Sequence, residues 1–299
     1  MSEHKTKPLN ISKKAPDNFG GLPAEFSKYG SSKVTILPVP FDKTCSWMKG
    51  SAKGPRAIII ASKNMELYDI ETASEVYKNG IHTARELTAG TSKTMIAKVC
   101  SGVRQCLHDE KFVVVLGGEH TVSLGSIMAH NELFNDLSIL HLDAHSDMRD
   151  AYEGNRYSHA CVMARVKDFN GRITSVGIRS MDSSELKNIS RKNIFYASDI
   201  QKSTDWIKKV SANLSRNVYV TIDLDVFDPS VMPSTGTPEP GGLGWYEVMD
   251  LLEHVSRSKT IVGFDVVELS PTKNPAPDFL AAKLIYKLLS FKFRSPRLK

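Results

Sequence analysis

The sequence predicts an α/β protein with a mostly parallel central sheet and helices on both faces. Short apolar, β-branched runs alternate along the chain with longer helix-like segments, which is typical of strand–helix–strand units. Some runs, such as residues 113–116 and 261–262, are apolar at every position, as expected for strands buried on both sides. Polar clusters come directly after three of the runs, at the edge where open parallel sheets bind ligands.

The strands and helices are expected in a regular order along the chain. Strands are expected at residues 33–39, 111–116, 137–142, 173–176, 193–196, 217–222 and 260–267. Helices are expected at residues 54–67, 92–108, 121–131, 159–166, 203–214, 244–254 and 277–289. Pro55 suits the first turn of its helix, and the Ser-Thr-Asp run at 203–205 offers a cap for another.

The chain is expected to form a single domain over residues 1–299, with a polar, Lys-rich N-terminal arm at about residues 1–30. A length of 299 residues allows one large α/β domain or two small ones. No low-complexity linker and no internal repeat divides the chain. The Pro/Gly-rich stretch 228–244 comes soon after Asp225, so we interpret it as a loop that shapes a site and not as a domain boundary.

Composition excludes several classes of protein. No run of about 18 or more apolar residues is present, so no membrane span is expected, and the N-terminus lacks the apolar segment of a secretory signal. Four cysteines without C-x-x-C spacing fit reduced thiols, which favours a cytoplasmic location. The net charge of +6 is spread along the chain without a basic, aromatic-interleaved motif, so nucleic-acid binding is not expected.

The polar clusters at the predicted strand ends contain candidate metal ligands. If Glu119 and His141 are left aside, the clusters provide two imidazoles and four carboxylates: His120, Asp143, His145, Asp147, Asp223 and Asp225. Four carboxylates brought together without cations would repel one another, and two divalent ions would neutralise them. Carboxylates and imidazoles without thiolates suit Mn²⁺ better than a structural zinc ion. Two such ions can hold a bridging hydroxide as a nucleophile.

Each cluster also has an ordinary structural interpretation. A single Asp-x-His or Asp-x-Asp is usually a cap or a turn, and His120 alone could be a hydrogen-bonded core histidine. A two-metal site is favoured because all three clusters lie at the ends of predicted strands.

Further motifs give the chain a resemblance to a known family. They lie at residues 117–120, 143–147, 157–159, 175–180, 223–229 and 264–271. With these motifs the chain resembles the ureohydrolases, meaning arginases, agmatinases and related amidinohydrolases. The resemblance implies a three-layer α/β/α domain, two Mn²⁺ per chain and a homo-oligomer, usually a trimer or hexamer.

The resemblance also implies roles for the candidate ligands. One ion would be held by His120, Asp143, Asp147 and Asp223, and the other by Asp143, His145, Asp223 and Asp225. Asp143 and Asp223 therefore resemble bridging carboxylates, and Asp147 resembles a residue that also orients the hydroxide.

Two further residues resemble catalytic groups of the family. Glu268 resembles the carboxylate that holds the guanidinium in line, and His159 resembles the histidine that gives the leaving amine its proton. Their structural alternatives are a surface or capping carboxylate for Glu268 and a helix-start hydrogen bond for His159. Many relatives have Gly-Thr after the Ser-His pair, whereas this chain has Ala160 and Cys161.

The loops favour agmatine as the substrate. Residues 148–157 and 235–243 resemble agmatinases more than arginases, so the favoured reaction is agmatine plus water to putrescine plus urea, a step of polyamine biosynthesis. The candidate contacts to the substrate tail are Glu153 and Asn155. Asp150 or Glu153 could favour an ammonium group, whereas Arg149 or Arg156 could attract the carboxylate of a guanidino acid.

Three alternatives stay open. An arginase or a guanidino-acid hydrolase would use the same catalytic groups on a different tail. A non-catalytic paralogue would bind a guanidino ligand without turnover. A single-metal amidohydrolase of similar fold is disfavoured because all six candidate ligands are present.

Overall fold

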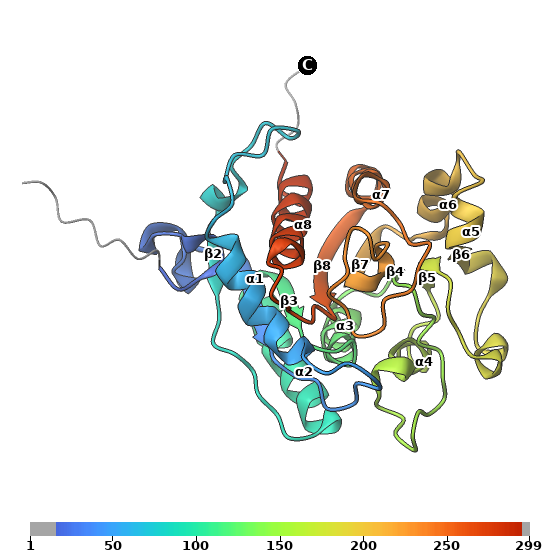
Figure 1. The fold of residues 1–299 in the computed structure, drawn as a ribbon. Helices are drawn as coiled ribbons and strands as arrows, with labels where there is room; N and C mark the ends of the chain where they lie inside the picture. The colour runs from blue at the N-terminus through green and yellow to red at the C-terminus, as the bar shows by residue number, and fades with distance from the viewer. Residues whose placement is uncertain (1–15, 295–299) are drawn as a thin grey trace, which may run out of the picture.

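An eight-stranded sheet, parallel throughout, organises the chain. The computed structural model describes residues 16–294, and its strands have the order β2-β1-β3-β8-β7-β4-β5-β6 (Figure 1). The strands are β1 Val34–Val39, β2 Ile81–Thr83, β3 Phe112–Gly117, β4 Leu137–Leu142, β5 Ile173–Ile178, β6 Ile194–Tyr196, β7 Asn217–Asp223 and β8 Thr260–Val267. The predicted parallel α/β fold is confirmed.

Helices cover both faces of the sheet and bury its two sides in separate apolar clusters. The helices are α1 Gly54–Ser62, α2 Ser92–His108, α3 Val122–Leu133, α4 Val162–Lys167, α5 Ala197–Ile200, α6 Trp206–Asn213, α7 Trp245–Ser258 and α8 Ala276–Lys292. One cluster joins α1, α6, α7 and α8 to the sheet, and the other joins α2, α3 and α4. In Figure 1, α6, α7 and α8 lie along the top of the view, and α2, α3 and α4 lie below.

The alternation of side chains along the strands explains why both faces are apolar. Val114 and Leu116 of β3 point into the first cluster, whereas Val113 and Val115 point into the second. Because successive side chains of a strand point to opposite faces, a strand covered on both sides must be apolar at every position. The continuous apolar runs of the sequence have this physical origin.

The structure adds elements that the sequence did not predict. The edge strand β2 and the short helix α5 are too brief to give a pattern over several turns or residues. The helix expected at 203–214 starts later, at Trp206, and Asp205 caps it only by position, without a side-chain hydrogen bond. Pro55 does lie in the first turn of α1, as predicted.

The predicted N-terminal arm lies partly outside the described residues. From residue 16 onward it contains three short 3₁₀ turns, Phe19–Gly21, Ala24–Phe26 and Tyr29–Ser31, which lead into β1. Residues 1–15 of the arm and residues 295–299 at the C-terminal end are not described. Among the helices of residues 16–294, none is long and apolar enough to cross a membrane.

Candidate metal centre and active-site cavity

The candidate ligands lie at the carboxyl ends of four adjacent strands in the middle of the sheet. The strands β3, β8, β7 and β4 are neighbours, although β3 and β4 are consecutive in the sequence. His120 comes after β3, Glu268 after β8, and the two aspartate motifs lie at the ends of β7 and β4. The loops after these strands meet at one edge of the sheet, so residues up to 148 positions apart come into contact.

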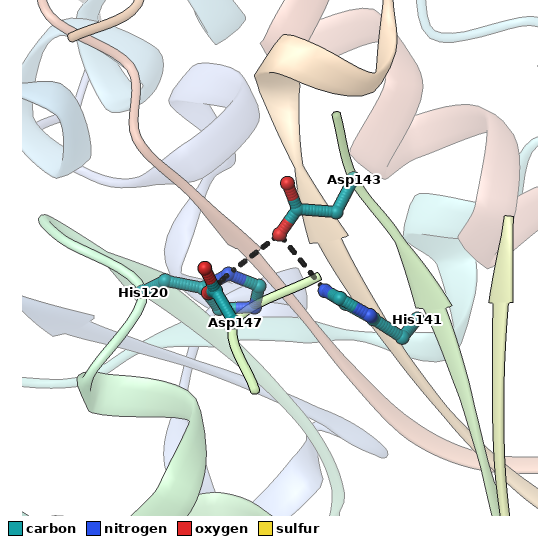
Figure 2. Close-up of side chains that lie close together, drawn as sticks. All are labelled: His120, His141, Asp143 and Asp147. Carbon is teal, nitrogen blue, oxygen red and sulfur yellow. Dashed lines mark hydrogen bonds and ion pairs between the residues drawn. The ribbon is translucent and has the colours of Figure 1, made fainter. Parts of the chain in front are cut away.

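His120 faces three carboxylates from two other strands. Its Nδ1 lies 3.1 Å from Asp143 Oδ2, 3.1 Å from Asp147 Oδ2 and 3.4 Å from Asp223 Oδ2. Figure 2 shows Asp143 and Asp147 directed toward the His120 ring. Despite this proximity, the buried Nδ1 has no partner in hydrogen-bonding geometry. One imidazole nitrogen and three convergent oxygens form a donor set that suits a divalent cation.

A second group of donors shares Asp143 with the first. Ligand atoms of Asp143, His145 and Asp225 lie close enough together to hold one ion. His145 Nδ1 is 2.9 Å from Asp225 Oδ2 and 3.6 Å from Asp143 Oδ1. The geometry therefore places Asp143 between two adjacent groups of donors, and the six candidate ligands lie together.

The carboxylates carry more negative charge than the site's own groups can neutralise. Burial, followed by repulsion from Asp225 and Asp143, raises the pKa of Asp223 well above its usual value. Burial and Asp143 likewise raise the pKa of Asp225. Burial would lower the pKa of His145, but the Asp225 carboxylate raises it to about 12. Asp223, Asp225 and His145 therefore bind protons tightly, and bound cations would replace those protons.

A further histidine orients Asp143. His141 Nε2 lies 2.8 Å from Asp143 Oδ2 (Figure 2), and its Nδ1 lies 3.0 Å from Ser175 Oγ. Its side chain is fully buried and does not line the cavity. Such a partner fixes the direction of a ligating carboxylate. The sequence shows His141 beside the motif but does not reveal this contact.

A buried chain of hydrogen bonds orients His120 from the opposite side. His120 Nε2 lies 2.9 Å from Thr221 Oγ1, and Thr221 donates to Asp265 Oδ1 at 2.7 Å. Tyr219 donates to the other Asp265 oxygen, also at 2.7 Å. These contacts hold the ring so that Nδ1 points to the cluster of carboxylates.

Backbone conformation contributes to the site at several residues. A Cβ atom at position 118 would lie 2.1 Å from the Phe41 carbonyl oxygen, so only glycine fits before Glu119 and His120. Asp147 and Glu268 both have positive φ, at 53° and 66°, although neither is glycine. Residues other than glycine rarely adopt this region, and strain of this kind is concentrated at functional sites.

The loop that carries Asp147 is held by Glu185. This buried carboxylate accepts hydrogen bonds from Ser146 Oγ and from the backbone N–H of Met148, which flank Asp147. It also accepts from the backbone N–H of Asp182 in a capping box. The sequence offers only the capping pattern Asp-x-x-Glu as a signal, so the contact with the metal-site loop was missed.

Glu268 lies beside the candidate ligands, and one of its carboxylate oxygens accepts a hydrogen bond. Its Oε1 accepts from the backbone N–H of His120 at 2.7 Å, and its own N–H donates to the Gly118 carbonyl at 2.7 Å. Burial, followed by repulsion from Glu119, raises the pKa of Glu268 well above its usual value. A cation placed next to this carboxylate would be bound strongly, because few other groups compensate its charge.

His159 is positioned by a residue that the sequence did not single out. Its backbone N–H donates to Thr44 Oγ1 at 3.1 Å, and its Nδ1 lies 3.4 Å from the same oxygen. Thr44 in turn donates to both Glu119 oxygens, each at 2.7 Å. The ring packs edge-on against Tyr152 and lines the cavity. Glu119, left aside in the sequence, thus supports His159 through Thr44.

The candidate residues open onto a cavity of about 240 Å³. Besides the candidate residues, its lining includes Trp47, Met48, Arg149, Tyr152, Asp182 and Glu185. Five of the six candidate ligands line it, and Asp143 lies behind them. Glu153 is exposed and, like Asn155, is not among the lining residues; the Asn155 side chain accepts from Tyr157 N–H within its own loop. The structure therefore does not bring these two predicted substrate contacts to the cavity.

The residues in place of the common Gly-Thr pair are accommodated without disrupting the site. Ala160 lines the cavity, whereas Cys161 is fully buried and its thiol donates to the Asn155 carbonyl at 3.8 Å. Burial raises the pKa of Cys161 to about 11. This thiol is a packed side chain and not an activated nucleophile.

Comparison with known proteins identifies the family. The arginase family model matches residues 32–290. An N(1)-aminopropylagmatine ureohydrolase of Synechocystis sp. is 36% identical over 95% of this chain and 99% of its own length. An agmatinase of Pyrococcus horikoshii is 32% identical over 87% of this chain and 92% of its own length. The crystal structure of agmatine ureohydrolase of Thermoplasma volcanium superposes with a TM-score of 0.85 at 33% identity, covering 95% of this chain and 96% of that one.

The chain belongs to the arginase family. It is a metal-dependent ureohydrolase, an enzyme that hydrolyses guanidino compounds, and its histidine and aspartate cluster is a metal-binding site. The resemblance found in the sequence is confirmed at the level of the family and of the reaction class.

Proposed function

We propose that this ureohydrolase hydrolyses agmatine to putrescine and urea. The observation that carries the proposal is the acidity of the cavity, which is lined by Asp147, Asp182, Glu185, Asp223, Asp225 and Glu268. Arg149 is the one lysine or arginine among the lining residues of the described chain. Agmatine has a guanidinium at one end and an ammonium at the other, so both ends are attracted to such a cavity.

Two Mn²⁺ ions are proposed as the metals, held as the resemblance implies by His120, Asp143, His145, Asp147, Asp223 and Asp225. The distances between these side chains and the absence of thiolates support two hard to borderline cations. When bound, the metal pair supplies a water-derived nucleophile at neutral pH, which the resonance-stabilised guanidinium carbon requires.

Glu268 is proposed to hold the guanidinium. Its carboxylate is buried next to the ligands and faces the cavity, so it fixes both the position and the plane of a bound guanidinium. Asp147, at the end of its own strained loop, is proposed to orient the nucleophile. His159 is proposed to deliver a proton to the leaving amine, for which the Thr44 contact places its ring at the cavity wall.

A substrate whose tail ends in a carboxylate is disfavoured. The Arg149 guanidinium lies 3.6 Å from both Asp182 and Glu185 and also stacks on Tyr152, so its charge is already compensated. Arg156 lies elsewhere, near Asp168 and outside the cavity lining. An arginine or a guanidino acid would place its carboxylate among carboxylates, which makes its binding free energy less favourable.

A second candidate substrate is N1-aminopropylagmatine, in which the tail amine of agmatine carries a propylamine arm. The Synechocystis relative is named for this compound, whereas the Pyrococcus relative is named for agmatine. Both compounds give urea and a polyamine by the same chemistry, so the catalytic proposal covers both. The two compounds differ only in their tails, so contacts between the tail and the outer cavity would determine which of them is preferred.

Urea release from the Mn²⁺-loaded protein tests the proposal, with agmatine, N1-aminopropylagmatine, arginine and 4-guanidinobutyrate compared side by side. We expect turnover of the two amine-tailed compounds, with arginine and 4-guanidinobutyrate at least about 100-fold slower in kcat/KM. Preference for either carboxylate-tailed compound would contradict the substrate class. Two bound metals per chain without urea from any compound would favour the non-catalytic alternative.

A Glu268→Gln variant tests the catalytic assignment separately. It keeps the hydrogen bond to His120 N–H but removes the charge, so we expect retained metal and a loss of about 100-fold or more in kcat/KM. Unchanged kinetics would remove Glu268 from the site.

The single-domain organisation, the trimeric or hexameric assembly and the cytoplasmic location are likewise proposed from the sequence and the resemblance. Sedimentation of the full-length protein tests the assembly.

A further inference from the structure

The mouth of the cavity contains an aromatic side chain that the proposed reaction does not use. Trp47 lines the cavity, yet 70% of its surface is exposed. A tryptophan that lines a cavity offers a large apolar ring face to a ligand, and this side chain is enriched at interfaces for that reason. Its neighbour Met48 also lines the cavity and is 39% exposed.

The loop that presents Trp47 is anchored at both ends. At its start, Thr44 donates its N–H and its hydroxyl to Glu119, each at 2.7 Å. At its end, the Gly50 N–H donates to Asp42 Oδ2 at 3.2 Å, which closes the loop onto its own beginning. Thr44 also contacts His159. The loop tip is therefore a fixed part of the cavity wall, with Trp47 at its outer side.

The tip lies near the proposed guanidinium site, with Gly236 between them. A Cβ atom at Gly236 would be 3.4 Å from the Met48 carbonyl oxygen and 4.0 Å from Glu268 Oε2. The loop tip and the Glu268 carboxylate thus both lie close to Gly236. A substrate whose guanidinium is at Glu268 and whose tail leaves on this side of the cavity would pass the tip.

Trp47 is the aromatic residue of the lining whose face is available to such a tail. Tyr152, the other aromatic residue of the lining, already has the Arg149 guanidinium 5.2 Å from its ring centre. Within residues 16–294, no lysine or arginine is stacked on Trp47. Lys43 and Lys49 flank the loop tip but are not among the lining residues. Tryptophan is the strongest cation–π partner among the side chains.

We infer that Trp47 is a specificity-determining residue that stacks on the outer ammonium of the substrate and so favours agmatine extended by a second cationic arm. The inference rests on the proposed function, because it assumes that the guanidinium binds at Glu268. Agmatine places its single tail ammonium nearer to the metal centre. The added propylamine arm would bring a second ammonium to the cavity mouth, where the indole face of Trp47 is exposed.

The test compares Trp47→Leu and Trp47→Phe with the wild-type enzyme on agmatine and on N1-aminopropylagmatine. Leucine keeps the apolar bulk and removes the ring, whereas phenylalanine keeps a ring face. For Trp47→Leu we expect kcat/KM on the extended compound to fall about three- to tenfold, mainly through KM, with less than about a twofold change on agmatine. Trp47→Phe should restore most of this loss.

Tyr246→Ala is the matched control, because Tyr246 is also 70% exposed but does not line the cavity. It should leave the ratio of the two kcat/KM values unchanged. An equal loss on both substrates in Trp47→Leu, or identical behaviour of the Leu and Phe variants, overturns the inference while leaving the proposed function in place. Failure of the wild-type enzyme to release urea from either compound overturns both.

Discussion

Two buried regions of this protein differ in how the negative charge of their carboxylates is compensated. On the side of α8, Asp69 is 1% exposed and meets the Lys287 ammonium at 2.8 and 3.1 Å, with Thr72 donating its N–H and its hydroxyl to the same carboxylate. Burial would raise the pKa of Asp69, but these partners lower it below its usual value. Here the chain supplies the compensating cation itself.

At the sheet edge the chain supplies no lysine or arginine for this purpose. Within residues 16–294, no lysine or arginine pairs with the side chains of Asp143, Asp223 or Asp225, and their ionic contacts are to histidines. The pKa of Asp223 and of Asp225 is raised by burial and by the neighbouring carboxylates. Burial alone therefore does not identify a functional carboxylate. A buried cluster of carboxylates without a lysine or arginine partner indicates a site for bound metal ions.

The largest effect is expected when the shared carboxylate is removed. Asp143→Ala deletes the residue common to both groups of donors, so we expect loss of bound metal and a fall of at least about 1,000-fold in urea release. Metal content by mass spectrometry and steady-state kinetics measure the two effects. Two metals per chain with normal turnover would contradict the shared position of Asp143.

Removal of the internal cation should destabilise the fold without touching the site. Lys287→Met leaves Asp69 buried and unpaired, for which we expect a loss of roughly 3–5 kcal/mol in the free energy of unfolding. Urea denaturation measures it, and metal content should not change. The double variant Lys287→Met with Asp69→Asn should recover part of the stability, since no buried charge remains. A further loss in the double variant would contradict the electrostatic explanation.

The histidine behind Asp143 should affect metal affinity more moderately. In His141→Phe the hydrogen bond to Asp143 is lost, and we expect metal affinity to weaken about 10- to 100-fold. The matched control is His130→Phe, because His130 is equally buried but its Nδ1 bonds the Ser126 carbonyl and it has no hydrogen bond to a candidate ligand. Equal metal affinity in the two variants, measured by calorimetry, would assign His141 to packing alone.

The smallest expected effect concerns how the stability of the metal-free protein changes with pH. In the metal-free protein, the raised pKa values of Asp223, Asp225 and His145 mean that the folded site binds protons more tightly than the unfolded chain. These groups should therefore make the metal-free protein more stable as pH falls from about 7 toward 5. Asp69 acts oppositely, since its lowered pKa contributes stability that is lost only below its usual value of 3.8.

Thermal melts from pH 7 to 3 check this prediction. We expect the melting temperature of metal-free protein to rise by a few degrees on mild acidification and then to fall below about pH 4. Mn²⁺ should abolish the rise, and Asp225→Asn should reduce it. A melting temperature that falls steadily from pH 7 would show that the site carboxylates do not repel one another as described.

Much of the fold and of the metal centre could be predicted from local patterns. Val113 to Leu116 predict a strand covered on both faces because both of their alternating sides are apolar. Asp143, His145 and Asp147 were found because they lie at alternate positions just after such a strand. The edge strand β2 was missed because three residues, Ile81 to Thr83, are too few to show a period.

The second layer of the site could not be predicted in this way. Thr44 and Glu119 are 75 residues apart, and His120 and Glu268 are 148 apart, so no local period connects them. Glu153, predicted from its place between two motifs, was not brought to the cavity, whereas Asp182 and Glu185 were. Proximity to a motif in the sequence therefore does not predict which loop residues of a parallel sheet line the site.

Three features could be inferred from the sequence alone: the α/β alternation, the edge of the sheet at which the candidate site lies, and the kinds of metal ligand present there. These features depend on the period of apolar residues and on the polar side chains at the carboxyl end of each strand. Only the tertiary structure decided that β8 and β7 lie between β3 and β4, which brings Glu268 to His120 and Asp223 to Asp143. It also decided that Trp47 stands at the mouth of the cavity. Strand order and loop placement arise from the packing of the whole core, to which residues far apart in sequence contribute together.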